Sequence, residues 1–134
     1  KGDMQSLNIT IKTLGERLAY VGGVPTAEII AEAYLAIGVS TYSSAVFNFV
    51  PALAVKFYQA LREGDHDFVR RVTQEFFIPF VTLRDTTKGY AVSLIKAGAG
   101  LVGYPAGDVR APLVMPSAQE LETLKRLIEH AERL

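Results

Sequence analysis

The chain has 134 residues, of which 49% are hydrophobic and 21% charged, so it is long enough for one domain and apolar enough to bury a core. Lys plus Arg number 14, as do Asp plus Glu, and this balance gives no basic footprint for nucleic acid or an anionic membrane surface. The absence of cysteine excludes disulfides and cysteine-ligated metals, and no apolar run reaches the roughly 18 residues of a membrane-spanning helix, so we expect a cytoplasmic protein.

The first half of the chain predicts helices alternating with short strands. Residues 3–14 predict a helix that ends at Gly15, and residues 18–21 predict a strand. A helix follows from Pro25 to Gly38, then a second strand over 39–43 and a helix over 51–64. The helix after Pro25 is expected to bury a stripe made of Ile29, Ile30, Ala33, Tyr34 and Ile37.

The second half of the chain predicts helices only. Residues 65–80 form one helix, residues 84–98 another that ends at Gly98, and residues 117–134 a last one begun by a capping box of Ser117 and Glu120. A Gly- and Pro-rich irregular segment precedes the last helix. An aromatic row is interpreted as core or subunit interface; it consists of Phe68, Phe76, Phe77 and Phe80.

The alternation of strands and helices in residues 17–64 predicts a parallel sheet with helices packed outside it. Two parallel strands do not make a stable sheet, because parallel strands need both faces covered and neighbours on their edges. We therefore interpret this region as the later part of a larger α/β domain, whose first strands come from an upstream segment or from another chain.

The first candidate site follows the first predicted strand. Ligands of parallel α/β folds bind at the carboxyl ends of the strands, where this chain places Gly22, Gly23, Val24 and Pro25. Glycines let a ligand approach the backbone, and the start of the next helix offers free N–H groups to an anion. The alternative interpretation is a plain tight turn.

The second candidate site follows the second predicted strand, at Ser43, Ser44 and Asn48. Strand alternation places Ser43 and Ser44 on opposite sides, so only one hydroxyl faces the interior of a barrel or cleft. The alternative is capping, in which Ser44 or Asn48 satisfies backbone N–H groups at the start of the next helix.

The remaining polar residues favour structural roles. His66 and His130 are interpreted as solvated helix residues, and surface solvation is the simplest role for Lys88, Lys96 and Arg110, although each is able to bind a carboxylate. The sequence contains no metal-ligand cluster, P-loop, nucleophile elbow or dinucleotide fingerprint.

Residues 15–65, "GERLAYVGGVPTAEII" to "ALREGD", resemble the seventh and eighth β/α units of the dihydrodipicolinate synthase / N-acetylneuraminate lyase family. Within it, "GGVPTAE", "TYSSAVFNFVP" and "KGYAVSLIKAG" are most similar to the members that act on 5-dehydro-4-deoxyglucarate. The resemblance implies the last two β/α units of a (βα)8 TIM barrel over residues 1–64, followed by a C-terminal helical region over 65–134. It also implies a homotetramer.

The family chemistry that the resemblance implies is a Schiff base between a barrel lysine and the 2-keto group of a keto-deoxy sugar acid. Loss of water and CO₂ then gives 2,5-dioxopentanoate, with no metal and no organic cofactor. The family lysine ends the sixth strand in a pattern like Lys-Asp-Gly-x-Gly-Asp. Lys1-Gly2-Asp3 matches its end, which places the catalytic lysine three residues upstream of Lys1; in another register Lys1 is itself that lysine.

Two alternatives remain open. One is another member of the family, such as a 2-keto-3-deoxy sugar acid aldolase or a dihydrodipicolinate synthase. The other, from a different class, is a non-catalytic helical interaction module in which residues 68–80 form a docking face.

Overall fold

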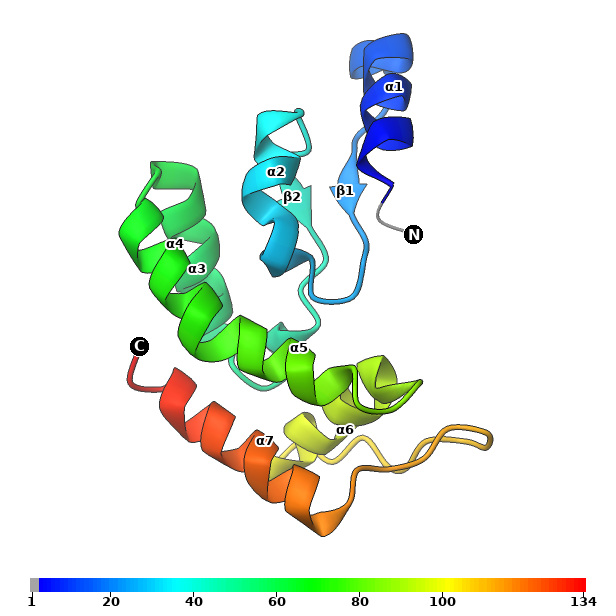
Figure 1. The fold of residues 1–134 in the computed structure, drawn as a ribbon, viewed down its shortest axis with the longest axis vertical. Coiled ribbons are helices and arrows are strands. Elements are labelled where there is room, and N and C mark those ends of the chain that lie inside the picture. Colours follow the sequence, from blue (N-terminus) through cyan, green and yellow to red (C-terminus); the bar gives the residue numbers. More distant parts are fainter. Residues whose placement is uncertain (1–2) are drawn as a thin grey trace. The chain divides into compact units, whose positions relative to one another are not determined.

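The structure is a computed structural model that describes residues 3–134, and the chain divides into two compact units between Ser44 and Ala45 (Figure 1). We call them the N-terminal unit and the C-terminal unit. By its contacts, the helix that follows Pro51 belongs with the C-terminal helices, whereas the resemblance placed it with the barrel. The assignment of residues 1–64 to a barrel and 65–134 to a separate helical region stays a prediction.

The N-terminal unit contains one long helix, two short parallel strands and a short helix. Its elements are α1 (Met4–Leu14), the 3₁₀ turn η1 (Gly15–Arg17), β1 (Val21–Gly22), the 3₁₀ turn η2 (Ala27–Ile30), α2 (Ala31–Ala36) and β2 (Thr41–Tyr42). The strands pair in parallel, with Val21 opposite Thr41 and Gly22 opposite Tyr42, and they lie side by side in Figure 1. The small core of the unit is built on Ala27, Tyr34 and Val39.

Both strands are shorter than predicted. The first begins at Val21 instead of residue 18, and Leu18 is half exposed. The second spans Thr41–Tyr42 instead of residues 39–43. A strand exists only where a neighbour pairs with it, and each of these strands has one described neighbour, so the apolar pattern extends further than the pairing.

The predicted buried stripe of the second helix is wrong in part. Ala27, Ala31 and Tyr34 are buried, whereas Ile29 and Ala33 are exposed. The helix begins with the 3₁₀ turn η2, which has about three residues per turn instead of 3.6 and so shifts which residues face the core.

The C-terminal unit is a set of packed helices. Its elements are the 3₁₀ turn η3 (Val46–Asn48), α3 (Pro51–Glu63), α4 (His66–Val72), the π-helical turn η4 (Thr73–Phe77), α5 (Ile78–Arg84), α6 (Tyr90–Leu101) and α7 (Ala118–Ala131). Helix α7 packs against α5, α6 and η4. Gly64 ends α3 in the left-handed conformation that glycine adopts without strain, as predicted.

The predicted aromatic core is confirmed. Phe57, Phe76 and Phe77 are completely buried, and Phe80 is 1% exposed. The Phe77 ring contacts the Phe57 ring edge-on at 4.8 Å between centroids and the Phe76 ring at 5.2 Å, while Phe80 lies parallel to Phe76 at 6.1 Å. These contacts join α3 to the run from α4 to α5, so the aromatic row is accounted for by packing within the unit.

The helix predicted over residues 65–80 contains a π-helical turn and continues to Arg84. Pro79 has no N–H and its ring clashes with the carbonyl of Glu75 in a regular α-helix. The wider turn η4 accommodates that clash immediately before the proline.

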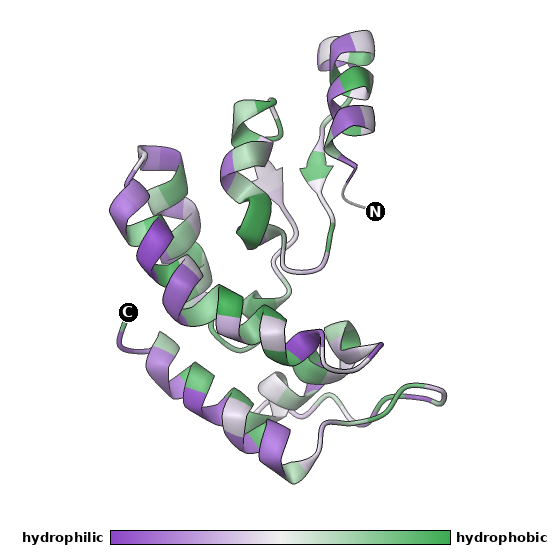
Figure 2. Ribbon diagram, in the orientation of Figure 1, coloured by the Kyte–Doolittle hydropathy of each residue, from purple (hydrophilic) through white to green (hydrophobic). Residues whose placement is uncertain are grey.

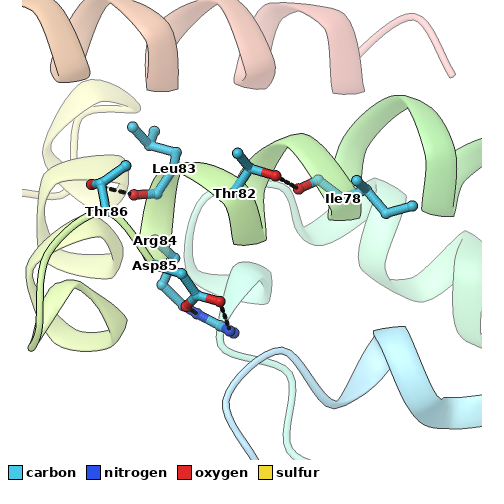
Figure 3. Close-up of polar contacts among 6 residues, drawn as sticks. All are labelled: Ile78, Thr82, Leu83, Arg84, Asp85 and Thr86. Carbon is cyan, nitrogen blue, oxygen red and sulfur yellow. Dashed lines mark hydrogen bonds and ion pairs between the residues drawn. The ribbon is translucent and has the colours of Figure 1, made fainter.

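The helix predicted over residues 84–98 is displaced. Residues 84–86 close α5 instead: the Thr86 hydroxyl donates to the Leu83 carbonyl at 2.8 Å, and Arg84 pairs with Asp85 (Figure 3). Helix α6 begins at Tyr90, after Gly89 with a φ of 101°, and continues beyond Gly98. Gly98 serves close packing instead, because a Cβ there would lie 2.6 Å from Cδ1 of Phe49.

The last helix agrees with its prediction. Ser117 accepts from the Glu120 backbone N–H, and the Glu120 carboxylate accepts from the Ser117 backbone N–H, which completes the capping box. Figure 2 shows hydrophilic and hydrophobic residues on different sides of α7, and the apolar side buries Leu124 and Ile128.

Candidate functional site

The ends of the two strands lie next to each other, as the sequence predicts. The Ser43 N–H donates to the Gly22 carbonyl at 2.9 Å, which extends the pairing of Gly22 with Tyr42 by one step. The segment after Gly22 and the segment after Tyr42 therefore leave the sheet from the same edge, where ligands bind in parallel α/β folds.

The two faces of this small sheet differ. Val21 is 58% exposed, and its partner Thr41 is exposed as well. On the opposite face, Gly22 is buried against the Tyr34 ring. Its partner Tyr42 is half-buried and packs against the small core that contains Tyr34. We call the face of Val21 and Thr41 the open face and the other the helix face.

Alternation along β2 now assigns the two serines. Ser43 follows the pattern of Thr41 and is exposed, so it belongs to the open face. Ser44 follows Tyr42, is half-buried, and its hydroxyl oxygen is enclosed. Of the two predicted binding hydroxyls, Ser43 is thus the accessible one.

The glycine pair serves two different purposes. A Cβ on Gly22 would lie 2.5 Å from Cε2 of Tyr34, so packing against that ring requires glycine at this position. Gly23 is exposed, and a Cβ there would meet nothing within 4 Å. Gly23 is therefore the glycine of the pair whose backbone is open to close approach, while the absence of a side chain at Gly22 is explained by the fold.

The loop after the glycines continues through Val24 and Pro25 into a strained residue. Val24 is half-buried against the small core, and Pro25 is exposed. Thr26 is buried, with a φ of 55° and a ψ of 56°. A left-handed conformation is unfavourable for a β-branched residue, so the surrounding structure holds this loop in one shape.

Asn48 lies in the C-terminal unit, where its side-chain amide donates to the Ala45 carbonyl at 2.8 Å. This contact closes the turn η3, but it satisfies a carbonyl and not a backbone N–H, and neither η3 nor α3 has a side-chain cap at its start. Asn48 is exposed, and the oxygen of its amide remains a hydrogen-bond acceptor.

An unpredicted residue, Glu28, lies at this edge of the N-terminal unit. Glu28 is 3% exposed, and neither of its carboxyl oxygens has a hydrogen-bond partner of good geometry among the described residues. The Ser44 hydroxyl neighbours the carboxyl and is itself without such a partner among residues 3–134. Buried polar groups are rarely left in this state, so the pair stands out.

Burial raises the pKa of Glu28 above the ordinary glutamate value. The Ser44 hydroxyl and the backbone of Glu28 itself act in the opposite direction, with smaller effects. Burial disfavours the charged form, so the carboxyl stays protonated to a higher pH than an exposed glutamate.

Sequence reasoning missed Glu28 because a glutamate in the first turn of a helix is ordinarily a solvated residue that suits the helix dipole. The available signal was its place in "TAEII", between apolar residues and directly after the glycine loop. Its burial depends on the 3₁₀ turn η2, which the periodicity does not predict.

Five other polar candidates belong to the C-terminal unit, and two of them, His130 and Lys96, have partners for their side chains. His130 Nε2 lies 2.9 Å from the Glu75 carboxylate, and Lys96 donates to the Ala106 carbonyl at 2.7 Å. His66, Lys88 and Arg110 are exposed. Lys1 lies outside the described residues. Within residues 3–134, no three His, Asp or Glu side chains gather as a metal site, and no helix has the length and hydrophobicity to cross a membrane.

Comparisons with known proteins agree on one family. A family model described as the dihydrodipicolinate synthetase family matches residues 1–131. The chain is 50% identical over 128 residues to "5-dehydro-4-deoxyglucarate dehydratase" of Pseudomonas putida, covering 96% of this chain and 42% of that protein. It is 54% identical over 128 residues to a "Probable 5-dehydro-4-deoxyglucarate dehydratase" of Allorhizobium ampelinum, again with 96% and 42% covered.

Solved structures agree on the fold. Dihydrodipicolinate synthase from Bacillus clausii superimposes with a TM-score of 0.80 at 27% identity, over 98% of this chain and 44% of that one. N-acetylneuraminate lyase from Proteus mirabilis superimposes with a TM-score of 0.79 at 20% identity, over 100% and 43%. These likenesses confirm the predicted fold class, the last β/α units of a TIM barrel followed by helices.

The chain spans about 42% of the length of the curated relatives from Pseudomonas putida and Allorhizobium ampelinum. The family match, in contrast, covers nearly the whole of this chain. Sequence, fold and the position of the candidate site therefore agree, and the chain belongs to the dihydrodipicolinate synthetase family.

Proposed function

We propose that this chain is the C-terminal part of a Schiff-base lyase that dehydrates and decarboxylates 5-dehydro-4-deoxyglucarate to 2,5-dioxopentanoate. The observation that supports it is the identity of about half of all residues with relatives named for that reaction. The solved dihydrodipicolinate synthases are more distant, at 24–27% identity, which disfavours their reaction as the alternative.

In this proposal the Schiff-base lysine lies upstream of Lys1 in the full-length protein. Its iminium with the 2-keto group draws electrons from the neighbouring carbon, which permits loss of a proton and then of water. The described residues have a binding role: they hold the far end of the substrate while the lysine holds the keto end.

The residues proposed for that role are those at the strand ends. Ser43 presents its hydroxyl on the open face, and Gly23 allows a substrate carboxylate to approach the backbone. Asn48, in the C-terminal unit, is proposed by itself as a substrate contact through its amide oxygen, since its amide nitrogen already donates to the Ala45 carbonyl. Gly22, Val24 and Pro25 shape the loop, and Ser44 supports it from the helix face.

We further propose a cytoplasmic homotetramer that binds neither nucleic acid nor membrane. The balanced charge supports the second statement, since nucleic-acid and anionic-membrane binding both draw on an excess of Lys and Arg. Light scattering of the full-length protein measures the assembly directly.

The test of the function uses the full-length protein with 5-dehydro-4-deoxyglucarate. We expect release of CO₂ and formation of 2,5-dioxopentanoate without added metal. Borohydride with substrate is expected to trap one lysine, and peptide mapping then locates it relative to Lys1. Activity with a different keto acid only, or no trapped lysine, contradicts the proposal.

A further inference from the structure

Glu28 is a buried ionisable group that the proposed reaction does not use. Its side chain lies almost completely out of water, at 3% exposure, with both oxygens unpartnered among the described residues. An ionised carboxylate in such a place is strongly unfavourable unless other groups compensate it. The neighbour available to it is the Ser44 hydroxyl.

The chemistry of this pair is reciprocal. A protonated carboxyl has one O–H donor and a second oxygen that accepts, and a serine hydroxyl both donates and accepts. After a small rotation of the hydroxyl, each group satisfies the other. An ionised carboxyl can only accept hydrogen bonds, so ionisation places a negative charge in this buried position and ends the donation from the carboxyl to Ser44.

The position of Ser44 gives this pair a consequence for the site. Ser44 comes directly after Ser43, and alternation sends the two side chains to opposite faces. A contact that holds Ser44 on the helix face therefore holds the Ser43 hydroxyl on the open face. The Ser43 N–H to Gly22 carbonyl bond, at 2.9 Å, fixes the backbone at the same step.

We propose that Glu28 is a positioning residue of the substrate site: its carboxyl exchanges hydrogen bonds with the Ser44 hydroxyl and thereby orients Ser43 toward the substrate. The inference rests on the proposed function for the identity of the substrate, but the pair itself does not depend on it.

The protonation of Glu28 adds a pH dependence to this role. Burial raises the pKa of Glu28, and the Ser44 hydroxyl and the backbone of Glu28 lower it by less. No charged side chain is among these causes. Ionisation changes the hydrogen bonding of the pair, so the KM for substrate is expected to change as the pH passes through the raised pKa of Glu28.

The experiment compares Glu28→Gln, Glu28→Ala, Ser44→Ala and the Glu28→Ala/Ser44→Ala double variant in the full-length protein, with KM and kcat measured across pH. Glu32→Gln is the matched control, because Glu32 is an exposed carboxyl on α2. Glutamine keeps a donor and an acceptor at every pH, so it reproduces the protonated pair.

We expect Glu28→Ala to raise KM about 5- to 30-fold with a smaller change in kcat, as for loss of one or two hydrogen bonds. Glu28→Gln should stay within about twofold of the low-pH KM and lose the pH dependence. The double variant should be no worse than Glu28→Ala. Additive effects in the double variant, or a KM pH dependence that persists in Glu28→Gln, overturn the proposal.

A second measurement separates this proposal from the proposed function. Infrared difference spectroscopy follows the protonated carboxyl of Glu28 as pH changes, with Glu28→Gln to identify the band. Ser44→Ala should shift the titration of that band, because the Ser44 hydroxyl is one of the groups that act on the pKa of Glu28. If the full-length protein does not act on 5-dehydro-4-deoxyglucarate, this shift still tests the pair, and an unchanged titration overturns it.

Discussion

The two units differ in the size of the core that each one builds. The C-terminal unit encloses Phe57, Phe76 and Phe77 completely. The N-terminal unit has a small core, and it leaves Leu18 and Val21 half exposed beside an open sheet face. Helices complete their backbone hydrogen bonds internally, whereas a parallel strand needs a neighbour on each side.

The comparison separates residues that serve packing from residues that are available to a substrate site. Packing explains the aromatic row and Gly98 of the C-terminal unit. The N-terminal unit keeps groups that packing does not explain, namely the Ser43 hydroxyl, Gly23 and the Glu28 carboxyl. Since the relatives are more than twice as long, we attribute the missing cover of its open face to the rest of a barrel.

The largest expected effect is a loss of stability from a change in the core of the C-terminal unit. Phe76→Ala removes a fully buried ring that contacts two other rings, so it should destabilise the full-length protein by about 3–5 kcal/mol. Urea unfolding measures the change. Val55→Ala, on an exposed position of α3, is the control and should change stability by less than about 0.5 kcal/mol. Intact stability with lost substrate binding in Phe76→Ala would mean that the ring belongs to the site.

The next effect concerns the open face. Ser43→Ala should lower kcat/KM for 5-dehydro-4-deoxyglucarate by about 5- to 150-fold, as for a lost hydrogen bond to a charged or polar group. Schiff-base trapping with pyruvate, which lacks the distal groups, should change much less. Asn48→Ala is the comparison: if its amide serves only the hydrogen bond to the Ala45 carbonyl, the melting temperature falls and kcat/KM stays near the parent value. Wild-type kinetics in Ser43→Ala would remove that hydroxyl from the site.

Replacing two glycines of α6 by alanine should change the free energy of unfolding in opposite directions. Gly98→Ala places a methyl group 2.6 Å from the Phe49 ring and should cost about 1–3 kcal/mol as overpacking. Gly100→Ala meets nothing within 4 Å and should stabilise by about 0.5–1 kcal/mol, since alanine favours the helix. Thermal unfolding of both variants checks the signs, and equal effects at the two positions would refute the packing role of Gly98.

The smallest expected effect is a dependence of the free energy of unfolding on pH, which comes from Glu28 in the N-terminal unit. The folded pKa of Glu28 is raised, so its contribution is complete below the ordinary glutamate pKa of about 4.3 and is lost as pH rises through the folded value. Urea unfolding at a series of pH values should show this decline in the parent protein and a flatter profile in Glu28→Gln. The same slope in both proteins would assign the decline to other groups.

The sequence by itself determined the elements whose signals are local. Pro51 and Gly64 bound α3, Ser117 and Glu120 cap α7, and the spacing of Phe68, Val72 and Phe76 predicts the buried side of its helix. These signals act within a few residues, through backbone dihedrals and single turns, so they can be recognised without knowledge of the rest of the fold. The family was legible as well, because its long motifs are contiguous in the chain.

Tertiary structure decided everything that depends on contact between distant residues. The pairing of Gly22 with Tyr42 determines that Ser43 faces outward and Ser44 inward, and no pattern within "TYSSA" distinguishes them. The same holds for Gly98, whose reason is the Phe49 ring, and for Glu28, which is buried through a change of helical phase in η2. Register, close packing and the burial of a charge are properties of neighbours in space, and a sequence orders only neighbours along the chain.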